Sequence, residues 1–153
     1  MEIIFDLFRP SYVEALDYDP DQVRRATQRL AGKYQSSLKI YQASATQMPG
    51  DDSQFDAVFD SGALHHIPDN RLALSEIWRV LKPGGRFFFL ELLSSLTLTP
   101  FMRFLTQHPP EAQFTWGEFT AKLEEAHLAL SGHRFFGSGK VVGVATKERH
   151  EER

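Results

Sequence analysis

The run RFFFLELL, residues 86–93, limits the possible folds more than any other stretch of this sequence. It follows the KPGG stretch at residues 82–85, which ends a helical pattern and turns the chain. A short and nearly unbroken apolar run is typical of a strand covered on both faces, as in the middle of a parallel sheet. Because parallel strands are joined by long crossovers, usually helices, this run predicts a sheet with helices packed against it.

Strand and helix patterns alternate along the rest of the chain. Strands are predicted at residues 12–16, 38–42 and 56–59, and a hairpin at residues 133–136 and 140–146 turns around Gly137-Ser138-Gly139. One helix is predicted from Asp19-Pro20 to Gly32, a second from Asp69 or Asn70, and a third from Thr115, where Glu118 completes a capping box. This alternation predicts an α/β sandwich, with a mostly parallel sheet and an antiparallel strand at one edge.

The composition narrows the class of protein. A chain of 153 residues fits a single domain, which we place at residues 1–147, followed by a charged tail at 148–153. The 17 basic and 20 acidic residues nearly cancel, so we expect no nucleic-acid partner. No apolar run is long enough to cross a membrane, and the N-terminus lacks the pattern of a signal peptide. With no cysteine, disulfides and thiolate nucleophiles are excluded, and we expect a cytoplasmic protein.

Polar residues follow three of the predicted strands. They are Asp17 after the first, Ser44 and Ala45 after the second, and Asp60, Ser61 and Gly62 after the third. Open α/β sheets bind ligands at the carboxyl ends of their strands, so these residues are expected to form one crevice. An acid such as Asp17 can bind ribose hydroxyls there, although it could also be a loop acid before a helix. Asp19 is expected to cap the helix.

Two adjacent histidines, His65 and His66, lie close behind the third of these strands. Adjacent side chains point in different directions, and no other cluster has the spacing of metal ligands, so we predict no metal site. We expect His65 to line the crevice and His66 to pack or cap. The GSGKVVG stretch at residues 137–143 looks like a phosphate loop, but a strand pattern follows it instead of the required helix, so we interpret it as a turn.

FDAVFDSGALHHIPD at residues 55–69 and SEIWRVLKPGGRFFFLEL at residues 75–92 resemble the second half of a class I S-adenosylmethionine-dependent methyltransferase, of the branch that acts on small molecules and lipids. The resemblance covers about residues 12–147. It implies a Rossmann-like three-layer sandwich, S-adenosyl-L-methionine as the cofactor and a small-molecule substrate.

The resemblance also implies roles for the residues at the strand ends. Asp17 would bind the adenosyl ribose, Tyr18 would lie beside the adenine, and Ser44 and Ala45 would approach the adenine amino group. The family usually has an aspartate where this chain has Ser44, so the charge is lost. Asp60, Ser61, Gly62 and His65 would lie near the methionyl part. No catalytic residue is assigned, and His65 is the first base to test for an oxygen or nitrogen acceptor.

The family's glycine-rich loop after the first strand is missing, since the first glycine of this chain is Gly32. The first strand and its helix are therefore missing or replaced. The segment MEIIFDLF cannot be that strand, because residues 9–11 are too few for a parallel crossover. We predict that residues 2–8 fold back as an antiparallel hairpin. A short helix is the alternative, and it would leave open sheet edges that allow self-association.

Three functional classes are weighed on these grounds. The leading hypothesis is a methyltransferase acting on a small molecule, with cofactor binding impaired by loss of the glycine-rich loop. The alternative is a non-catalytic, partner-binding member of the same fold, or a truncated gene product. A nicotinamide-dependent oxidoreductase is disfavoured, because its GxGxxG motif is absent.

Overall fold

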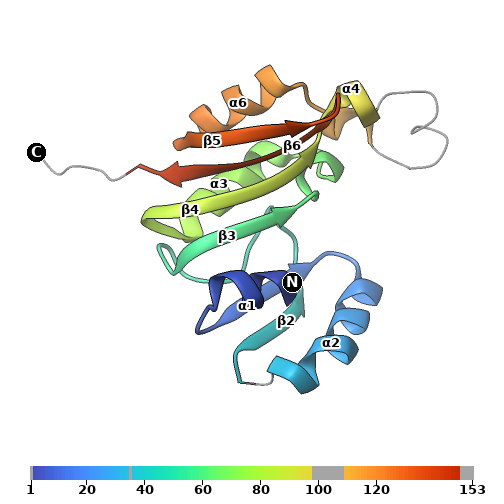
Figure 1. Cartoon of the computed structure of the whole chain (residues 1–153), viewed down its shortest axis with the longest axis vertical. Coiled ribbons are helices and arrows are strands. Elements are labelled where there is room, and N and C mark those ends of the chain that lie inside the picture. Colours follow the sequence, from blue (N-terminus) through green and yellow to red (C-terminus); the bar gives the residue numbers. More distant parts are fainter. Residues whose placement is uncertain (1, 35, 98–108, 149–153) are drawn as a thin grey trace, which may run out of the picture. The chain divides into compact units, whose positions relative to one another are not determined.

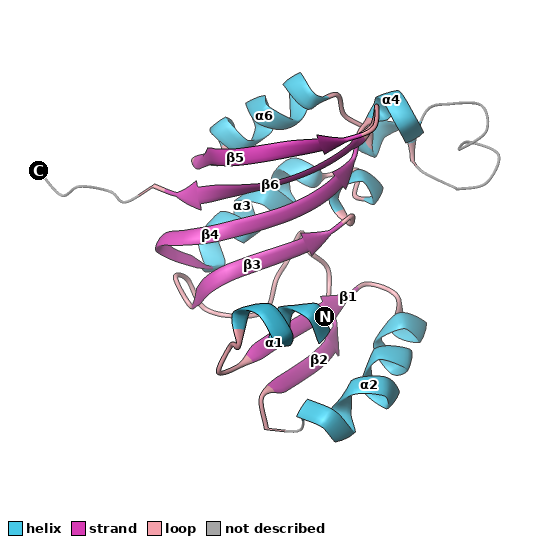
Figure 2. Ribbon diagram, in the orientation of Figure 1, coloured by secondary structure: helices cyan, strands magenta, loops and turns pink. Residues whose placement is uncertain are grey.

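The computed structural model describes residues 2–34, 36–97 and 109–148 (Figures 1 and 2). The chain forms two compact units, residues 1–47 and residues 48–153. Each contains its own sheet. The structure is α/β, with parallel strand pairs and an antiparallel C-terminal hairpin, which confirms the predicted fold class.

The first unit is built around one parallel strand pair. Its elements are α1 (Glu2–Phe8), β1 (Val13–Asp17), α2 (Pro20–Tyr34) and β2 (Leu38–Gln42). Val13 lies opposite Leu38, and Asp17 lies opposite Gln42. Because α2 is the crossover between the parallel strands, the carboxyl ends of β1 and β2 lie at the same edge of this small sheet.

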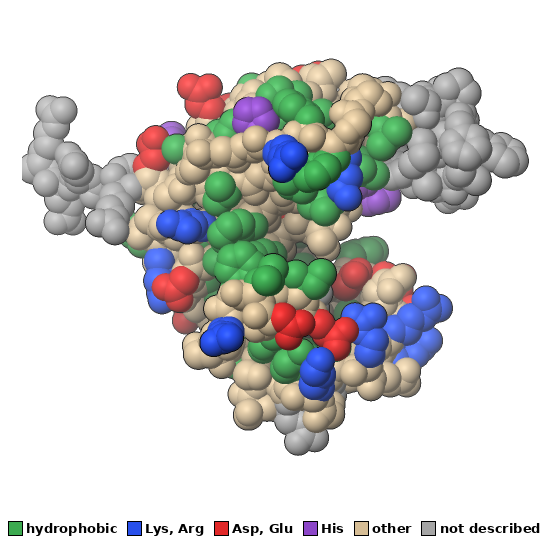
Figure 3. Space-filling model, in the orientation of Figure 1, with side chains coloured by type: hydrophobic (Ala, Val, Ile, Leu, Met, Phe, Trp, Pro, Cys, Tyr) green, Lys and Arg blue, Asp and Glu red, His purple; other side chains and the backbone are tan. Residues whose placement is uncertain are grey.

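The amphipathic pattern of α2 explains why it packs on this sheet. Val23 and Ala26 are half-buried on its inner side, and Leu30 is fully buried. Figure 3 shows Lys and Arg side chains over α2, where Arg24, Arg25, Arg29 and Lys33 are exposed. Asp19 accepts a hydrogen bond from the Asp21 amide, in agreement with its predicted role as a cap. The predicted end at Gly32 was wrong, because the helix continues to Tyr34.

The predicted hairpin at residues 2–8 was also wrong, since this segment forms α1. Ile4, Phe5 and Phe8 have helical spacing, and the Phe5 ring stacks on Tyr34 with 4.0 Å between the ring centres. Glu2 pairs with Lys33 at 3.1 Å, which ties α1 to the last turn of α2. Short apolar segments fit a helix and a strand equally well by pattern, so these contacts with α2 decide the outcome.

The second unit holds a four-stranded sheet in the order β3-β4-β6-β5. Its elements are β3 (Phe55–Ser61), a 3-10 turn η1 (Leu64–His66), α3 (Asn70–Val80), β4 (Leu81–Leu92), α4 (Ser94–Thr97), a 3-10 turn η2 (Pro110–Ala112), α6 (Trp116–Glu125), β5 (Leu128–Phe136) and β6 (Lys140–Lys147). β3 and β4 run parallel, whereas β6 is antiparallel to both of its neighbours. The hairpin predicted around Gly137-Ser138-Gly139 is confirmed.

Most predictions made from local sequence signals in this unit are confirmed. Asp69 caps α3 by accepting a hydrogen bond from the Leu72 amide, and Thr115 with Glu118 forms the predicted capping box of α6. The start of β4 was predicted too late. The strand begins at Leu81, and its pairing with β3 is irregular across the KPGG stretch at residues 82–85.

The core of the second unit lies between the sheet and the pair α3 and α6, which cover the same face of the sheet (Figure 1). Phe87 and Phe89 of β4 are almost fully buried on this face. Phe119 of α6 stacks on Phe114 and meets the edge of Phe89. Each such ring contributes about 1.5–3 kcal/mol by its burial. This packing fixes the carboxyl ends of β3 and β4, where the candidate site lies.

Candidate functional site

In the first unit, the carboxyl ends of β1 and β2 bring together four of the predicted residues: Asp17, Tyr18, Ser44 and Ala45. The Asp17 carbonyl accepts a hydrogen bond from the Ala43 amide at 3.1 Å. The Gln42 side chain donates to the Tyr18 carbonyl at 3.1 Å. These two bonds hold the turn after β1 against the turn after β2.

Asp17 and Tyr18 are both exposed at this edge. The Asp17 Oδ1 atom accepts a hydrogen bond from the Asp19 amide at 2.9 Å, which orients the carboxylate. A carboxylate has about four lone-pair sites, so this bond leaves capacity for a pair of hydroxyl groups. Tyr18 is 79% exposed and offers a flat apolar ring beside the acid.

Ser44 is held inside its own turn. Its hydroxyl lies 2.7 Å from the Thr46 hydroxyl and accepts a hydrogen bond from the Thr46 amide at 3.2 Å. Ser44 and Ala45 are half-buried. Since Ser44 carries no charge, any contact it makes with an adenine amino group would be a neutral hydrogen bond.

In the second unit, the turn after β3 brings together Asp60, Ser61, Gly62 and His65. The Asp60 Oδ1 atom accepts a hydrogen bond from the Ala63 amide at 2.8 Å, which closes the turn. Gly62 has a φ of +87°, a left-handed conformation that favours glycine. A Cβ atom at Gly62 would lie 3.4 Å from the His65 ring, so the turn approaches the imidazole closely.

His65 is buried and paired with Glu91, a residue that the sequence reasoning missed. The Nδ1 atom of His65 lies 2.5 Å from Glu91 Oε2, and the side chains are 3% and 0% exposed. His66 is exposed, and its ring lies 4.3 Å from the His65 ring. A signal for Glu91 was present, because it is the one charged residue in the apolar run from Phe87 to Leu93.

Burial and the neighbouring charged groups shift the pKa values of Asp60, Glu91 and His65. Burial, followed by the neighbouring Glu91 carboxyl, raises the pKa of Asp60 well above its ordinary value. Burial also raises the pKa of Glu91 and lowers the pKa of His65. The Oδ2 atom of Asp60 is buried and has no hydrogen-bond partner among the described residues. These shifts favour a proton on Asp60 and a neutral imidazole.

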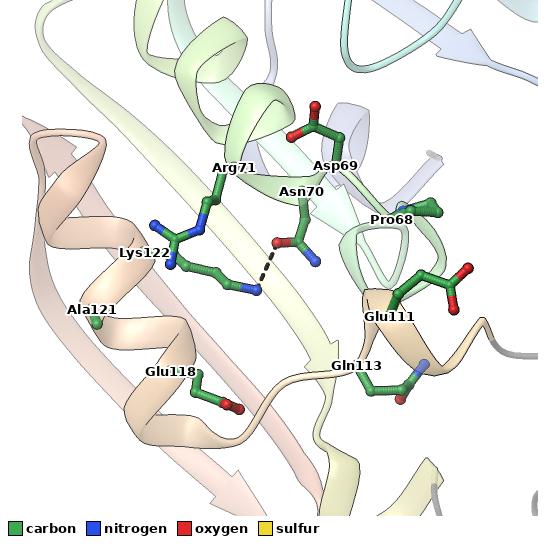
Figure 4. Close-up of a pocket in the computed structure, with 9 residues that line it drawn as sticks. All are labelled: Pro68, Asp69, Asn70, Arg71, Glu111, Gln113, Glu118, Ala121 and Lys122. Carbon is green, nitrogen blue, oxygen red and sulfur yellow. Dashed lines mark hydrogen bonds between the residues drawn. The ribbon is translucent and has the colours of Figure 1, made fainter.

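A polar groove of about 390 Å³ opens beside this turn, between α3 and α6 (Figure 4). Its lining residues are Pro68, Asp69, Asn70, Arg71, Glu111, Gln113, Glu118, Ala121 and Lys122. Lys122 donates a hydrogen bond to the Asn70 side chain at 2.7 Å, and Gln113 donates to the His65 carbonyl at 2.9 Å. Charges of both signs line the groove, and Gln113 connects it to the His65 turn.

The described ranges contain neither a metal-binding cluster nor a membrane-spanning helix. No group of three or more His, Asp and Glu side chains among residues 2–34, 36–97 and 109–148 could hold a metal ion. In the same part of the chain, no helix has the length and apolar character needed to span a membrane.

Comparison with known proteins assigns the family. Residues 2–89 match the family model described as a methyltransferase domain. The chain therefore belongs to this family, the class I S-adenosylmethionine-dependent methyltransferases, as the sequence resemblance implied. S-adenosyl-L-methionine is the cofactor of this class.

Individual relatives agree with this assignment. The chain is 38% identical over 84 residues to the ubiquinone/menaquinone biosynthesis C-methyltransferase UbiE of Brucella anthropi. That match covers 54% of this chain and 32% of the relative, so the chain matches about a third of the relative's length.

Two solved structures share the fold. One belongs to the complex between the Haloferax volcanii Trm112 methyltransferase activator and a methyltransferase, with a TM-score of 0.81, 17% identity and coverage of 99% of this chain and 78% of that chain. The other is a SAM-dependent methyltransferase from Methanosarcina mazei, with a TM-score of 0.72, 19% identity and coverage of 91% and 83%.

Proposed function

We propose that this protein binds S-adenosyl-L-methionine and transfers its methyl group to a small molecule. In this proposal Asp17, Tyr18, Ser44 and Ala45 bind the adenosyl part, and Asp60, Ser61, Gly62 and His65 serve the methionyl part. The observation that carries the proposal is the exposed pair Asp17 and Tyr18 at the carboxyl end of a parallel strand, with the Asp17 carboxylate oriented by the Asp19 amide at 2.9 Å.

Methyl transfer requires little of the protein beyond the alignment of donor and acceptor. The cofactor supplies a methyl group on a positively charged sulfur, which leaves as a neutral thioether when the acceptor attacks the carbon. The protein has to align the acceptor with the methyl group and exclude water. An acceptor that loses a proton in this step needs a base, and His65, with its lowered pKa, is neutral and can accept one.

The acceptor that we infer is a precursor in quinone biosynthesis. This inference is supported by the similarity over 84 residues to the ubiquinone/menaquinone biosynthesis C-methyltransferase of Brucella anthropi. Methylation of such a precursor at carbon agrees with the small-molecule class that the sequence resemblance implied.

Calorimetric titration with S-adenosylmethionine and with its demethylated product tests cofactor binding. We expect saturable heat, and Asp17→Asn should weaken binding by about 10- to 100-fold, because hydrogen bonds to a charged group are worth about 1.5–3 kcal/mol. Asp21→Asn is the matched control, since Asp21 is an exposed acid of α2 that pairs with Arg24. No heat at millimolar ligand would overturn the proposal.

A non-catalytic, partner-binding role is the second candidate. It is favoured by one observation, the uncharged Ser44 at the position where the family usually has an aspartate. Transfer of labelled methyl from the cofactor to a quinone precursor separates the two roles. Binding without transfer would favour the second candidate, whereas transfer that Asp17→Asn lowers supports the enzyme.

A further inference from the structure

Glu91 is the most deeply buried charged side chain near the β3 turn, and both of its oxygens are engaged. Oε1 accepts a hydrogen bond from the Leu64 amide at 2.8 Å. Oε2 lies 2.5 Å from His65 Nδ1 and accepts a longer bond from the Leu92 amide at 3.3 Å. An ionised carboxylate only accepts hydrogen bonds, so the two backbone amide donors, Leu64 and Leu92, match Glu91 in its charged form.

Asp60 provides a second carboxyl group in the same cluster. Its Oδ1 atom accepts from the Ala63 amide, while Oδ2 is buried without a hydrogen-bond partner among the described residues. Two neighbouring buried carboxyl groups do not both ionise readily, so one of them keeps a proton. Glu91 has the larger set of donors, so the proton belongs on Asp60.

This arrangement determines the tautomer of His65. A neutral imidazole has one N–H donor and one acceptor nitrogen, and the hydrogen bond made by one nitrogen decides which is which. If Nδ1 were the acceptor, it would face a carboxylate oxygen at 2.5 Å, and the two lone pairs would repel. Nδ1 must therefore carry the hydrogen, which makes Nε2 the acceptor nitrogen.

We propose that Glu91 is a positioning residue that holds His65 in the Nδ1–H form, so that Nε2 accepts a proton or a hydrogen bond at the carboxyl end of β3. Its role in methyl transfer rests on the proposed function. Among the described residues, the charged and titratable groups near His65 include Asp60 from β3, Glu91 from β4 and the neighbouring His66. Gln113, which is neutral, holds the His65 carbonyl from the side of η2.

The tautomer can be read by NMR of protein labelled with 15N in its imidazole rings, using long-range correlations between ring nitrogens and carbon-bound protons near pH 8. The His65 signal is assigned by its loss in His65→Gln. We expect the Nδ1–H pattern for His65 in the wild type, whereas imidazole in water favours the Nε2–H form. An Nε2–H pattern for wild-type His65 would overturn the proposal without the need for any variant.

Two isosteric variants separate the roles of the carboxyl groups. Glu91→Gln should cause loss of the Nδ1–H pattern, because the amide binds less strongly and can itself donate a hydrogen bond. Asp60→Asn should retain the pattern, because Asp60 already carries a proton. An unchanged pattern in folded Glu91→Gln would contradict the proposal, as would equal loss in both variants.

This experiment uses neither cofactor nor acceptor, so a failure of methyl-donor binding would not affect its outcome. Circular dichroism establishes that each variant is folded, and the wild-type spectrum is decisive if Glu91→Gln does not fold.

Discussion

Lys147, near the end of β6, places its ammonium group 3.9 Å from the centre of the Trp78 ring. The same group donates hydrogen bonds to the carbonyl oxygens of Trp78 and Leu81, at 2.8 and 2.7 Å. These carbonyls lie at the C-terminal end of α3, where a helix leaves its last carbonyls unsatisfied. Lys147 therefore joins the middle of the sheet to the end of α3.

We expect Lys147→Met to lower the free energy of unfolding by about 2–3 kcal/mol, because buried carbonyls would lose charged hydrogen bonds and the ring would lose a cation. Urea denaturation measures this change. Lys82→Met is the control, since Lys82 makes an exposed pair with Asp56 that should be worth less than about 1 kcal/mol. Equal effects of the two substitutions would contradict this account of Lys147.

The buried carboxyl group of Asp60 should make the stability depend on pH. A carboxyl whose pKa is raised by folding stabilises the folded state below its ordinary value, here 3.8, and this stabilisation is lost as the pH rises through the folded pKa. The folded state then holds more protons than the unfolded state, so the free energy of unfolding falls with increasing pH. Asp60→Asn stays neutral and should remove the part of this slope that Asp60 contributes, at most about 1.4 kcal/mol per pH unit, while Glu91, whose pKa is also raised, keeps its own part.

Chemical denaturation over a pH series from 4 upward, on wild type and variant, measures the difference. His65 works in the opposite direction, because its lowered pKa costs stability as the pH falls through its ordinary value of 6.5. This contribution is present in both proteins and largely cancels in their difference. Asp56→Asn is the control for an exposed acid, and parallel curves for wild type and Asp60→Asn would refute the assignment.

Gly143 of β6 lies where the sheet meets the aromatic core. A Cβ atom at this position would overlap the end of the Phe89 ring and lie 2.8 Å from the Gly132 carbonyl oxygen. We expect Gly143→Ala to destabilise the protein by about 1–3 kcal/mol, because the tightly packed ring and strand have to shift.

Gly117 of α6 is the matched control, since a Cβ atom there would meet nothing within 4 Å. Gly117→Ala should instead stabilise by about 0.4–1 kcal/mol, because alanine restricts the unfolded chain more than glycine does. Thermal unfolding of both variants tests the pair. A neutral Gly143→Ala would show that the sheet adapts more easily than its packing suggests.

The capping box of α6 also contributes measurably to stability. The Thr115 hydroxyl accepts a hydrogen bond from the Glu118 amide at 3.2 Å, and the Glu118 carboxylate accepts one from the Thr115 amide at 2.7 Å. Thr115→Ala should cost about 1 kcal/mol in urea denaturation. Ser75→Ala, at an exposed position inside α3, should change stability by less than about 0.5 kcal/mol. A reversed order of these effects would contradict the role of the cap.

The sequence alone predicted the elements whose signals are local. The capping box at Thr115, the strand at residues 38–42 and the hairpin around Gly137-Ser138-Gly139 all rest on patterns within a few residues. At residues 2–8 the sequence left a hairpin and a short helix as alternatives and favoured the hairpin, because a short apolar segment has no local signal that separates helix from strand. The contacts with Tyr34 and Lys33 that decide for the helix lie far along the chain.

The sequence also determined which residue types stand at the strand ends, among them Asp17 and Asp60, because strand ends follow from local patterns. Only the tertiary structure decided that Glu91 meets His65, which lies 26 positions away, and that Lys147 reaches Trp78, 69 positions away. Such pairs depend on the order and register of β3, β4 and β6. Strand register is set by the packing of whole elements against α3 and α6, and no short stretch of sequence contains that information.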